Sequence, residues 1–155
     1  MQEILQNLLL TTEYQYSVRI LIAAFLGMLL GYERALNKKT ASFRTFSLVS
    51  CASCIFTICS VLVSEMSEIS DPGRISAQIV SGVGFVGAGI IYKDRKHGSV
   101  EGITTAVMIW FSSALGMLCG FGQTVLGIIC VVIYIFILTL GKIMHIITED
   151  FKTKE

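Results

Sequence analysis

Long uncharged stretches alternate with short blocks of charge along this chain. The stretches without Asp, Glu, Lys or Arg are 20–32, 46–64, 75–92 and 102–141. A helix rises about 1.5 Å per residue and the hydrocarbon layer of a bilayer is about 30 Å thick, so roughly 20 residues cross it. The last stretch is long enough for two crossings, which we expect to be separated at 120–123. The pattern predicts five transmembrane helices, at about 14–33, 44–64, 73–92, 102–119 and 124–143.

These stretches are typical of helices and not of membrane strands. A membrane strand alternates apolar and polar residues, whereas a run such as 128–133 does not alternate. In lipid, only a helix satisfies its own backbone hydrogen bonds without closing a barrel. The predicted fold class is therefore all-α, a polytopic membrane protein in which residues 1–155 form one membrane domain, a bundle of about five helices.

Basic residues lie mainly in the turns of one predicted side. Four Lys or Arg occur in 34–44, three in 93–96 and three in 142–154, whereas only Arg19 and Arg74 belong to the other side. Because basic loops stay in the cytoplasm, we predict that the N-terminus is outside and the C-terminus is cytoplasmic.

The first 13 residues have no positively charged start that would indicate a cleaved signal peptide. Their apolar positions, Ile4, Leu5, Leu8 and Leu9, share one helical face. We therefore expect a separate short helix that lies on the external interface of the membrane.

The composition supports a membrane protein and argues against a cytosolic enzyme. Of the 155 residues, 54% are hydrophobic and 15% are charged, and the mean hydropathy is +0.73. A soluble domain usually carries about 25% charge, so this chain has too little polar surface to cover a water-soluble globule. The net charge of +1 implies no bulk attraction to nucleic acid. The expected environment of its surface is the lipid bilayer.

Small residues recur at steps of four in three of the predicted helices. The stripes are Ala23, Gly27 and Gly31; Ser112, Gly116 and Gly120; and Ala77, Ser81, Gly84 and Ala88. Because membrane helices associate through close packing of small residues, we expect 14–33, 73–92 and 102–119 to form the tight centre and 124–143 to face lipid. The alternative is that glycine is simply common in membrane helices. The predicted packing positions are Gly27, Gly31, Gly82, Gly84, Gly87, Gly89, Trp110 and Gly116.

Motifs that would indicate an enzyme or a cofactor site have the wrong context. The letters Gly82-x-Gly84-x-x-Gly87 match a dinucleotide fingerprint, but such a fingerprint needs a preceding strand in a soluble domain. Cys51 and Cys54 form one C-x-x-C pair without a second pair or histidines at zinc spacing. The chain has no H-E-x-x-H sequence and no aspartate pair within a predicted helix. We expect no catalytic residue, no metal site and no cofactor.

Polar residues at the predicted membrane boundaries form two candidate clusters. The outer-side cluster comprises Asp71, Arg74 and Gln78, with Asp71 as the N-cap and Pro72 at the first helical position. We expect Gln78 to face protein, because an unsatisfied amide in lipid is costly. The inner-side cluster comprises Glu33, Arg34, Arg44, Thr45, Glu101, Thr104 and Thr105. A carboxylate at this depth would pair with an arginine; the alternative is that each residue is an ordinary interfacial anchor.

At these residues the sequence resembles the MgtC/SapB family of bacterial inner-membrane proteins. The matching pieces are 31–34, 41–45, 102–106 with Trp110, and the long segment 71–89, which together extend over roughly 30–120. Ser42 stands where the family usually has glycine. Many members carry a C-terminal domain resembling an ACT fold, and this sequence ends at Glu155 without one, so nothing assigned to that domain is carried over. The resemblance implies a multi-pass protein of the bacterial inner membrane, associated with low magnesium, acid stress or survival inside hosts.

Two functions from different classes remain open. The first is a non-enzymatic regulatory subunit that binds another membrane complex, such as an ion-transporting ATPase. The second is a transporter or channel for Mg²⁺ or protons, in which backbone carbonyls of the glycine-rich helix would line the path. Sites for Mg²⁺ usually include carboxylates, and no Asp or Glu lies in 34–64, 72–93 or 102–148, so we favour the regulator. The stripes of small residues are compatible with a homodimer, although one core could use all of them.

Overall fold

The computed structural model describes residues 2–36, 41–66, 71, 73–95 and 98–152, with the backbone course alone for 2–10, 33–36, 142–143 and 145–152. Five helices make up most of this part of the chain and confirm the predicted all-α bundle. They are α1 (Gln2–Leu36), α2 (Phe43–Glu65), α3 (Arg74–Ile90), α4 (Ile103–Gly120) and α5 (Thr124–Lys152). Two short antiparallel strands, β1 (Tyr92–Lys93) and β2 (Val100–Glu101), connect α3 to α4.

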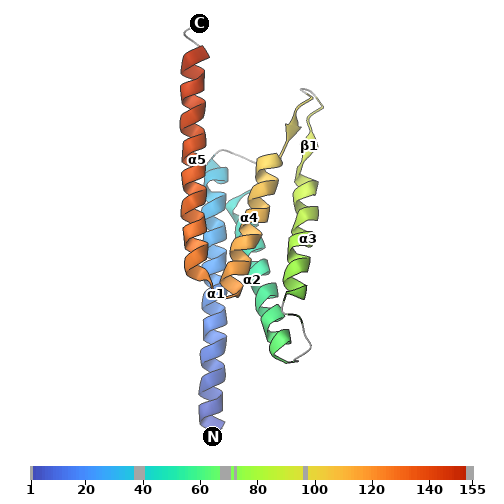
Figure 1. The fold of residues 1–155 in the computed structure, drawn as a ribbon, viewed down its shortest axis with the longest axis vertical. Coiled ribbons are helices and arrows are strands. Elements are labelled where there is room, and N and C mark those ends of the chain that lie inside the picture. The colour runs from blue at the N-terminus through green and yellow to red at the C-terminus, as the bar shows by residue number, and fades with distance from the viewer. Residues whose placement is uncertain (1, 37–40, 67–70, 72, 96–97, 153–155) are drawn as a thin grey trace.

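Successive helices run in opposite directions along one long axis (Figure 1). The N-terminus and the C-terminus therefore lie at opposite ends, and the β1–β2 hairpin lies at the C-terminal end. Four described helices are long and apolar enough to cross a membrane: 11–32 of α1, all of α2, all of α4, and 124–141 of α5. The remaining helix, α3, is apolar but has 17 residues, which gives a length of about 25 Å.

Two expectations about element boundaries are wrong. Residues 2–36 form one continuous helix, so no separate N-terminal helix precedes the first span. The span predicted at 73–92 ends at Ile90, because β1 pairs with β2 in the register Tyr92↔Glu101. Gly98 has a φ of +69° within this hairpin, and Gly102 has a φ of +90° at the start of α4. Such positive φ values favour glycine, which allows the chain to turn back at these two points.

The core lies between α1, α2 and α4, and not between the three helices that carry the glycine stripes. Its largest fully buried side chains include Leu30 of α1, Phe46 of α2, and Ile109 and Leu115 of α4. The predicted centre of the first, third and fourth spans is therefore wrong: α2 takes the place of α3, which packs at the side of the bundle against α4 and α2. The fifth helix is mostly exposed, as expected, with 11% of its 124–141 span buried.

Candidate functional site

Glycines of α1 and α4 allow α2 to approach both helices closely. A Cβ added to Gly27 would lie 2.5 Å from the Phe46 carbonyl oxygen, and one on Gly31 would meet the Phe43 backbone. A Cβ on Gly116 would meet the Ser50 carbonyl group. Because real Cβ contacts are longer than these, α2 could not take its position if any of the three carried a side chain. These three predicted packing residues thus lie at the centre of the bundle.

Hydroxyl groups of α2 and α4 form a buried polar seam inside this centre. Four described hydroxyl side chains of α2 are buried on its inner face: Ser50, Ser53, Thr57 and Ser60. The Ser53 and Ser113 hydroxyls hydrogen-bond each other at 2.8 Å, and the Ser112 hydroxyl donates to the Phe46 carbonyl at 2.7 Å. Thr57 donates to the carbonyl of its own helix at Ser53. The seam therefore joins α2 to α4 through polar contacts that lipid cannot replace.

Two seryl oxygens in this region are fully enclosed and have no hydrogen-bond partner among the described residues. They are Ser50 Oγ on α2 and Ser76 Oγ on α3. A buried hydroxyl without a partner costs about 1–3 kcal/mol, which an ordered water would offset. Ser50 is small and lies where α2 approaches Gly27 of α1 and Gly116 of α4, so its size contributes to the packing.

Arg19 was not among the residues predicted to be functional, yet it joins two distant parts of the bundle. Its Nη1 donates to the Gly120 carbonyl at the end of α4, at 3.2 Å, and its guanidinium lies over the Tyr16 ring at 5.5 Å. A Cβ on Gly122, whose φ is +81°, would lie 3.1 Å from Nη2 of this arginine. A cation at the C-terminal end of a helix is stabilised by the helix dipole. The sequence signal was present, because Arg19 is the one charge within 14–32.

The small-residue stripe of α3, which comprises Ala77, Ser81, Gly84 and Ala88, is exposed along its length. A Cβ on Gly84 would meet no atom within 4 Å, and the neighbouring Phe85 is 79% exposed. The predicted packing residues Gly82 and Gly89 are equally open, whereas Gly87 is buried with its Cβ position 3.7 Å from Ala106 of α4. The helix therefore uses Gly87 within the bundle and leaves the stripe uncovered.

Trp110 of α4 lies at the rim of a hollow between α3 and α4. It is 52% exposed and shares this hollow with Val80 and Phe121. No glycine is among the residues that line this hollow, and the predicted packing role of Trp110 stays a prediction.

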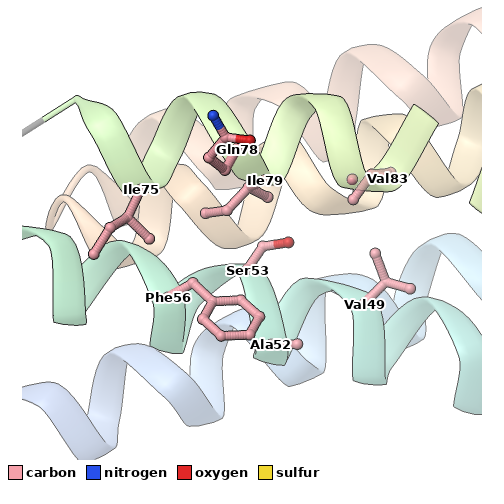
Figure 2. Close-up of a pocket in the computed structure, with 9 residues that line it drawn as sticks. Val49, Ala52, Ser53, Phe56, Ile75, Gln78, Ile79 and Val83 are labelled. Atoms are coloured by element: carbon pink, nitrogen blue, oxygen red, sulfur yellow. The ribbon is translucent and has the colours of Figure 1, made fainter. Parts of the chain in front are cut away.

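Gln78 lines a groove between α2 and α3 instead of facing the bundle core. The groove has a volume of about 360 Å³, and Figure 2 shows α2 and α3 presenting side chains to it from opposite walls. Ser53 and Gln78 supply the polar side chains of the groove. Gln78 has no hydrogen-bond partner among the described residues.

The outer-side residues start α3 but are not bonded to one another through their side chains. Asp71 Oδ1 accepts a hydrogen bond from the Gly73 backbone N–H at 2.8 Å, and the Asp71 carbonyl accepts one from the Arg74 N–H at 3.2 Å. Gly73 is the N-cap, so the prediction of Asp71 in that position is wrong by two residues, although Asp71 still closes the turn. Pro72 lies outside the described residues. Among the described residues, no ion pair joins Asp71 to Arg74.

The inner-side residues are only partly within the described structure. The side chains of Glu33 and Arg34 lie outside it. The Arg44 guanidinium lies over the Phe43 ring at 5.8 Å, and Glu101 Oε1 accepts a hydrogen bond from Ser99 at 3.2 Å. Thr104 is exposed, Thr45 is half-buried and Thr105 is 6% exposed. Among the described residues, Arg44 and Glu101 form no ion pair with each other, so the cluster stays a prediction.

The described cysteines and acidic residues show no arrangement for metal binding. All five cysteines are free, and the described residues contain no group of three or more His, Cys, Asp or Glu that could hold a metal ion.

Residues 20–147 match the model of the MgtC family. A protein named MgtC from Salmonella typhimurium is 42% identical over 110 residues, which cover 71% of this chain and 45% of that protein. MgtC from Brucella abortus is 46% identical over 100 residues, which cover 64% of this chain and 40% of that protein. An uncharacterized protein of Haemophilus influenzae is 33% identical over 133 residues, which cover 82% of this chain and 56% of that protein.

The matched part of the chain spans about half the length of these relatives. No solved structure matches the chain. The residues that match the family model begin within α1 and end within α5. They therefore include parts of all four membrane-length helices and the whole of the shorter α3. This chain therefore belongs to the MgtC family.

Proposed function

We propose that this chain is a non-enzymatic membrane subunit that binds another membrane complex, such as an ion-transporting ATPase, and regulates ion homeostasis under low magnesium or related stress. The observation that carries the proposal is the exposed stripe of Ala77, Ser81, Gly84 and Ala88 on α3. In lipid, helices associate through close packing of small residues, since apolar side chains gain nothing by leaving the acyl chains. A stripe that the chain's own helices leave uncovered is suited to a helix of a second protein.

The contrast with the other glycines supports this assignment. Gly27, Gly31 and Gly116 are used within the bundle, where a Cβ on any of them would meet the backbone of α2. A Cβ on Gly84 would meet no atom within 4 Å. One set of small residues thus holds the bundle together, and the other set stays available for an external contact.

Family membership supports the proposed setting of this contact. The MgtC/SapB resemblance implies the bacterial inner membrane and a role under low magnesium. The basic hairpin and the C-terminal end lie at the same end of the bundle (Figure 1), so the positive-inside rule favours a cytoplasmic C-terminus. A Mg²⁺ or proton transporter is the competing function, but no Asp or Glu occurs within 72–93 or 102–148 to bind a divalent cation.

Co-isolation from membranes of magnesium-limited cells tests the proposal. The wild-type chain, Gly84→Leu and the control Gly141→Leu are each purified in mild detergent, and the retained proteins are identified by mass. Both glycines have open space around them, so both variants are expected to fold. We expect the wild-type chain and Gly141→Leu to retain the same membrane complex in fixed proportion, and Gly84→Leu to lose it.

Two results would contradict the regulatory role. One is retention of the same complex by Gly84→Leu at the wild-type level. The other is a flux of Mg²⁺ or protons into liposomes containing the purified chain that exceeds the flux into empty vesicles, which would favour the transporter. A second copy of this chain as the sole retained protein would replace the proposed complex with a homodimer.

A further inference from the structure

A groove between α2 and α3 is an apolar space that the described residues leave unfilled. Its volume is about 360 Å³, within the usual size range of small-ligand sites. The lining residues are Val49, Ala52, Ser53 and Phe56 of α2, and Ile75, Gln78, Ile79, Gly82 and Val83 of α3. Figure 2 shows Ile75 and Ile79 of α3 directed towards α2. Because the Ser53 hydroxyl is already bonded to Ser113, Gln78 carries the one polar side chain of the lining that has no partner among the described residues.

The length of the groove matches one acyl chain and not a transmembrane helix. From Ile75 to Val83 the lining extends over eight helical steps, or about 12 Å. One leaflet contributes about 15 Å of hydrocarbon, whereas a spanning helix needs about 30 Å. The groove begins at the second residue of α3, at one end of the bundle. It therefore extends from one boundary of the membrane to about its middle.

Residues of opposite charge occur on the turn that starts α3, which precedes the first groove residue of this helix, Ile75. Arg74 immediately precedes Ile75, is exposed, and forms no ion pair with a described carboxylate. Asp71 Oδ1 is fixed by the Gly73 N–H at 2.8 Å, which leaves its second oxygen available. Glu65 ends α2 at the same end of the bundle and is also exposed. This end of the bundle therefore carries an exposed guanidinium and exposed carboxylates, charges of both signs that suit a headgroup with both signs of charge.

The polar groups follow the order of a phospholipid from headgroup to tail. Arg74 is suited to a phosphate, because its planar guanidinium binds phosphate oxygens through two parallel hydrogen bonds. Gln78 lies one turn deeper, about 6 Å along α3, where its amide can donate to an ester carbonyl. Below it, Ile79 and Val83 continue the apolar wall.

We propose that this groove binds one molecule of an amine-bearing zwitterionic phospholipid. One acyl chain lies between α2 and α3, the phosphate binds Arg74, the ammonium group binds Asp71, and Gln78 donates to an ester carbonyl. The site is separate from the exposed stripe of α3, which faces away from α2, and it does not depend on the proposed regulatory function.

Native mass spectrometry of the full chain in detergent tests this proposal with defined lipids. The purified chain is stripped of lipid and titrated with phosphatidylethanolamine, or with phosphatidylglycerol of the same acyl chains, which lacks the ammonium group. We expect one phosphatidylethanolamine to remain bound, with clear preference over phosphatidylglycerol. Arg74→Gln is expected to weaken binding about tenfold, and Arg74→Lys less, because one charge-assisted hydrogen bond remains.

Two further variants separate the groove from the headgroup. Gly82→Leu places a side chain in the groove, where a Cβ meets no atom within 4 Å, and is expected to abolish retention of the lipid. Gly84→Leu is the matched control on the outer stripe and is expected to bind lipid like the wild-type chain. Asp71→Asn keeps an oxygen that can accept from the Gly73 N–H but removes the charge, so the preference for phosphatidylethanolamine should disappear.

Equal binding of the two lipids by the wild-type chain would overturn the assignment of the ammonium group and with it the proposal. Unchanged binding by Gly82→Leu, or equal losses in Gly82→Leu and Gly84→Leu, would overturn the assignment of the groove. Neither result bears on whether Gly84→Leu loses a protein partner, so the two proposals fail independently.

Discussion

Alanine at position 116 is expected to separate α2 from α4. A Cβ at this position would meet the Ser50 carbonyl oxygen and lie 2.8 Å from its carbon and 2.9 Å from Ser53 Cβ. Non-bonded carbon atoms normally approach to about 3.5–4.0 Å, so the two helices must move apart by roughly 1 Å. The movement also stretches the 2.8 Å hydrogen bond between the Ser53 and Ser113 hydroxyls.

The magnitude follows from three contributions to the free energy of unfolding. Overpacking of a well-packed core costs about 1–3 kcal/mol, and loss of the hydroxyl hydrogen bond adds about 1 kcal/mol. Replacing a helical glycine by alanine stabilises the helix by up to about 1 kcal/mol. We therefore expect Gly116→Ala to lower the free energy of unfolding by about 1–3 kcal/mol. At Gly84 a Cβ meets no atom within 4 Å, so Gly84→Ala changes the helix propensity alone. This variant should raise the free energy of unfolding by up to about 1 kcal/mol.

Unfolding in mixed micelles measures this difference. Increasing fractions of a denaturing detergent unfold each variant, and the fluorescence of Trp110, the single tryptophan of the chain and part of α4, follows the transition. We expect Gly116→Ala to unfold well before the wild-type chain and Gly84→Ala to unfold slightly after it. Gly116→Ala as stable as Gly84→Ala would refute the close approach of α2 to α4.

Three further predictions use the same unfolding measurement. Arg19→Gln removes the 3.2 Å hydrogen bond to the end of α4 and should lower the free energy of unfolding by about 1.5–3 kcal/mol. Arg19→Lys keeps the positive charge and should lower it by less. Equal losses in the two variants would exclude a role for the charge. Gly102→Ala should destabilise the chain more than Gly98→Ala. Both glycines have a positive φ, but only a Cβ on Gly102 would meet a carbonyl oxygen, that of the last residue of α3. The reverse order of stability would argue against this contact. Ser113→Ala leaves the Ser53 hydroxyl unpaired and should lower the free energy of unfolding by about 1–3 kcal/mol. The Ser53→Ala/Ser113→Ala double variant should lower it by less than the sum of the two single variants. Strictly additive losses would contradict the hydrogen bond between the two hydroxyls.

The charge pattern predicts the helices of this protein well, because burial of charge in lipid is costly and the gaps between charges bound each span. It predicts their ends less well. The span expected to reach Tyr92 stops at Ile90, since backbone pairing with Val100 and Glu101 gives Tyr92 and Lys93 a strand partner that hydropathy does not reveal. The turn signal in the sequence was Gly98, which takes a positive φ.

Glycine-rich stripes alone predict the wrong packing partner for α1 and α4. Ser50, Ser53, Thr57 and Ser60 give α2 an equally small inner face, and their hydroxyls add hydrogen bonds that glycine cannot make. The sequence contains this stripe at helical spacing. Serine spaced in this way in an apolar helix is therefore a packing signal in its own right.

The polar clusters show a different limit of sequence reasoning. The predicted inner-side cluster rests on the shared depth of residues such as Arg44 and Glu101 in the membrane. Whether two side chains meet also depends on the rotation of each helix about its axis and on the turn geometry, neither of which depth determines. In the structure Glu101 belongs to β2 and accepts from Ser99, while Arg44 lies over Phe43.

Photo-crosslinking within the membrane tests the central claim, that the exposed stripe of α3 is a contact surface for another membrane protein. A photoreactive residue replaces Ser81 on the stripe or, as a control, Val125, which is 69% exposed on α5. Irradiation of cells grown in low magnesium should give one discrete protein adduct from position 81 and only lipid adducts from position 125. Lipid adducts alone from both positions would contradict the account.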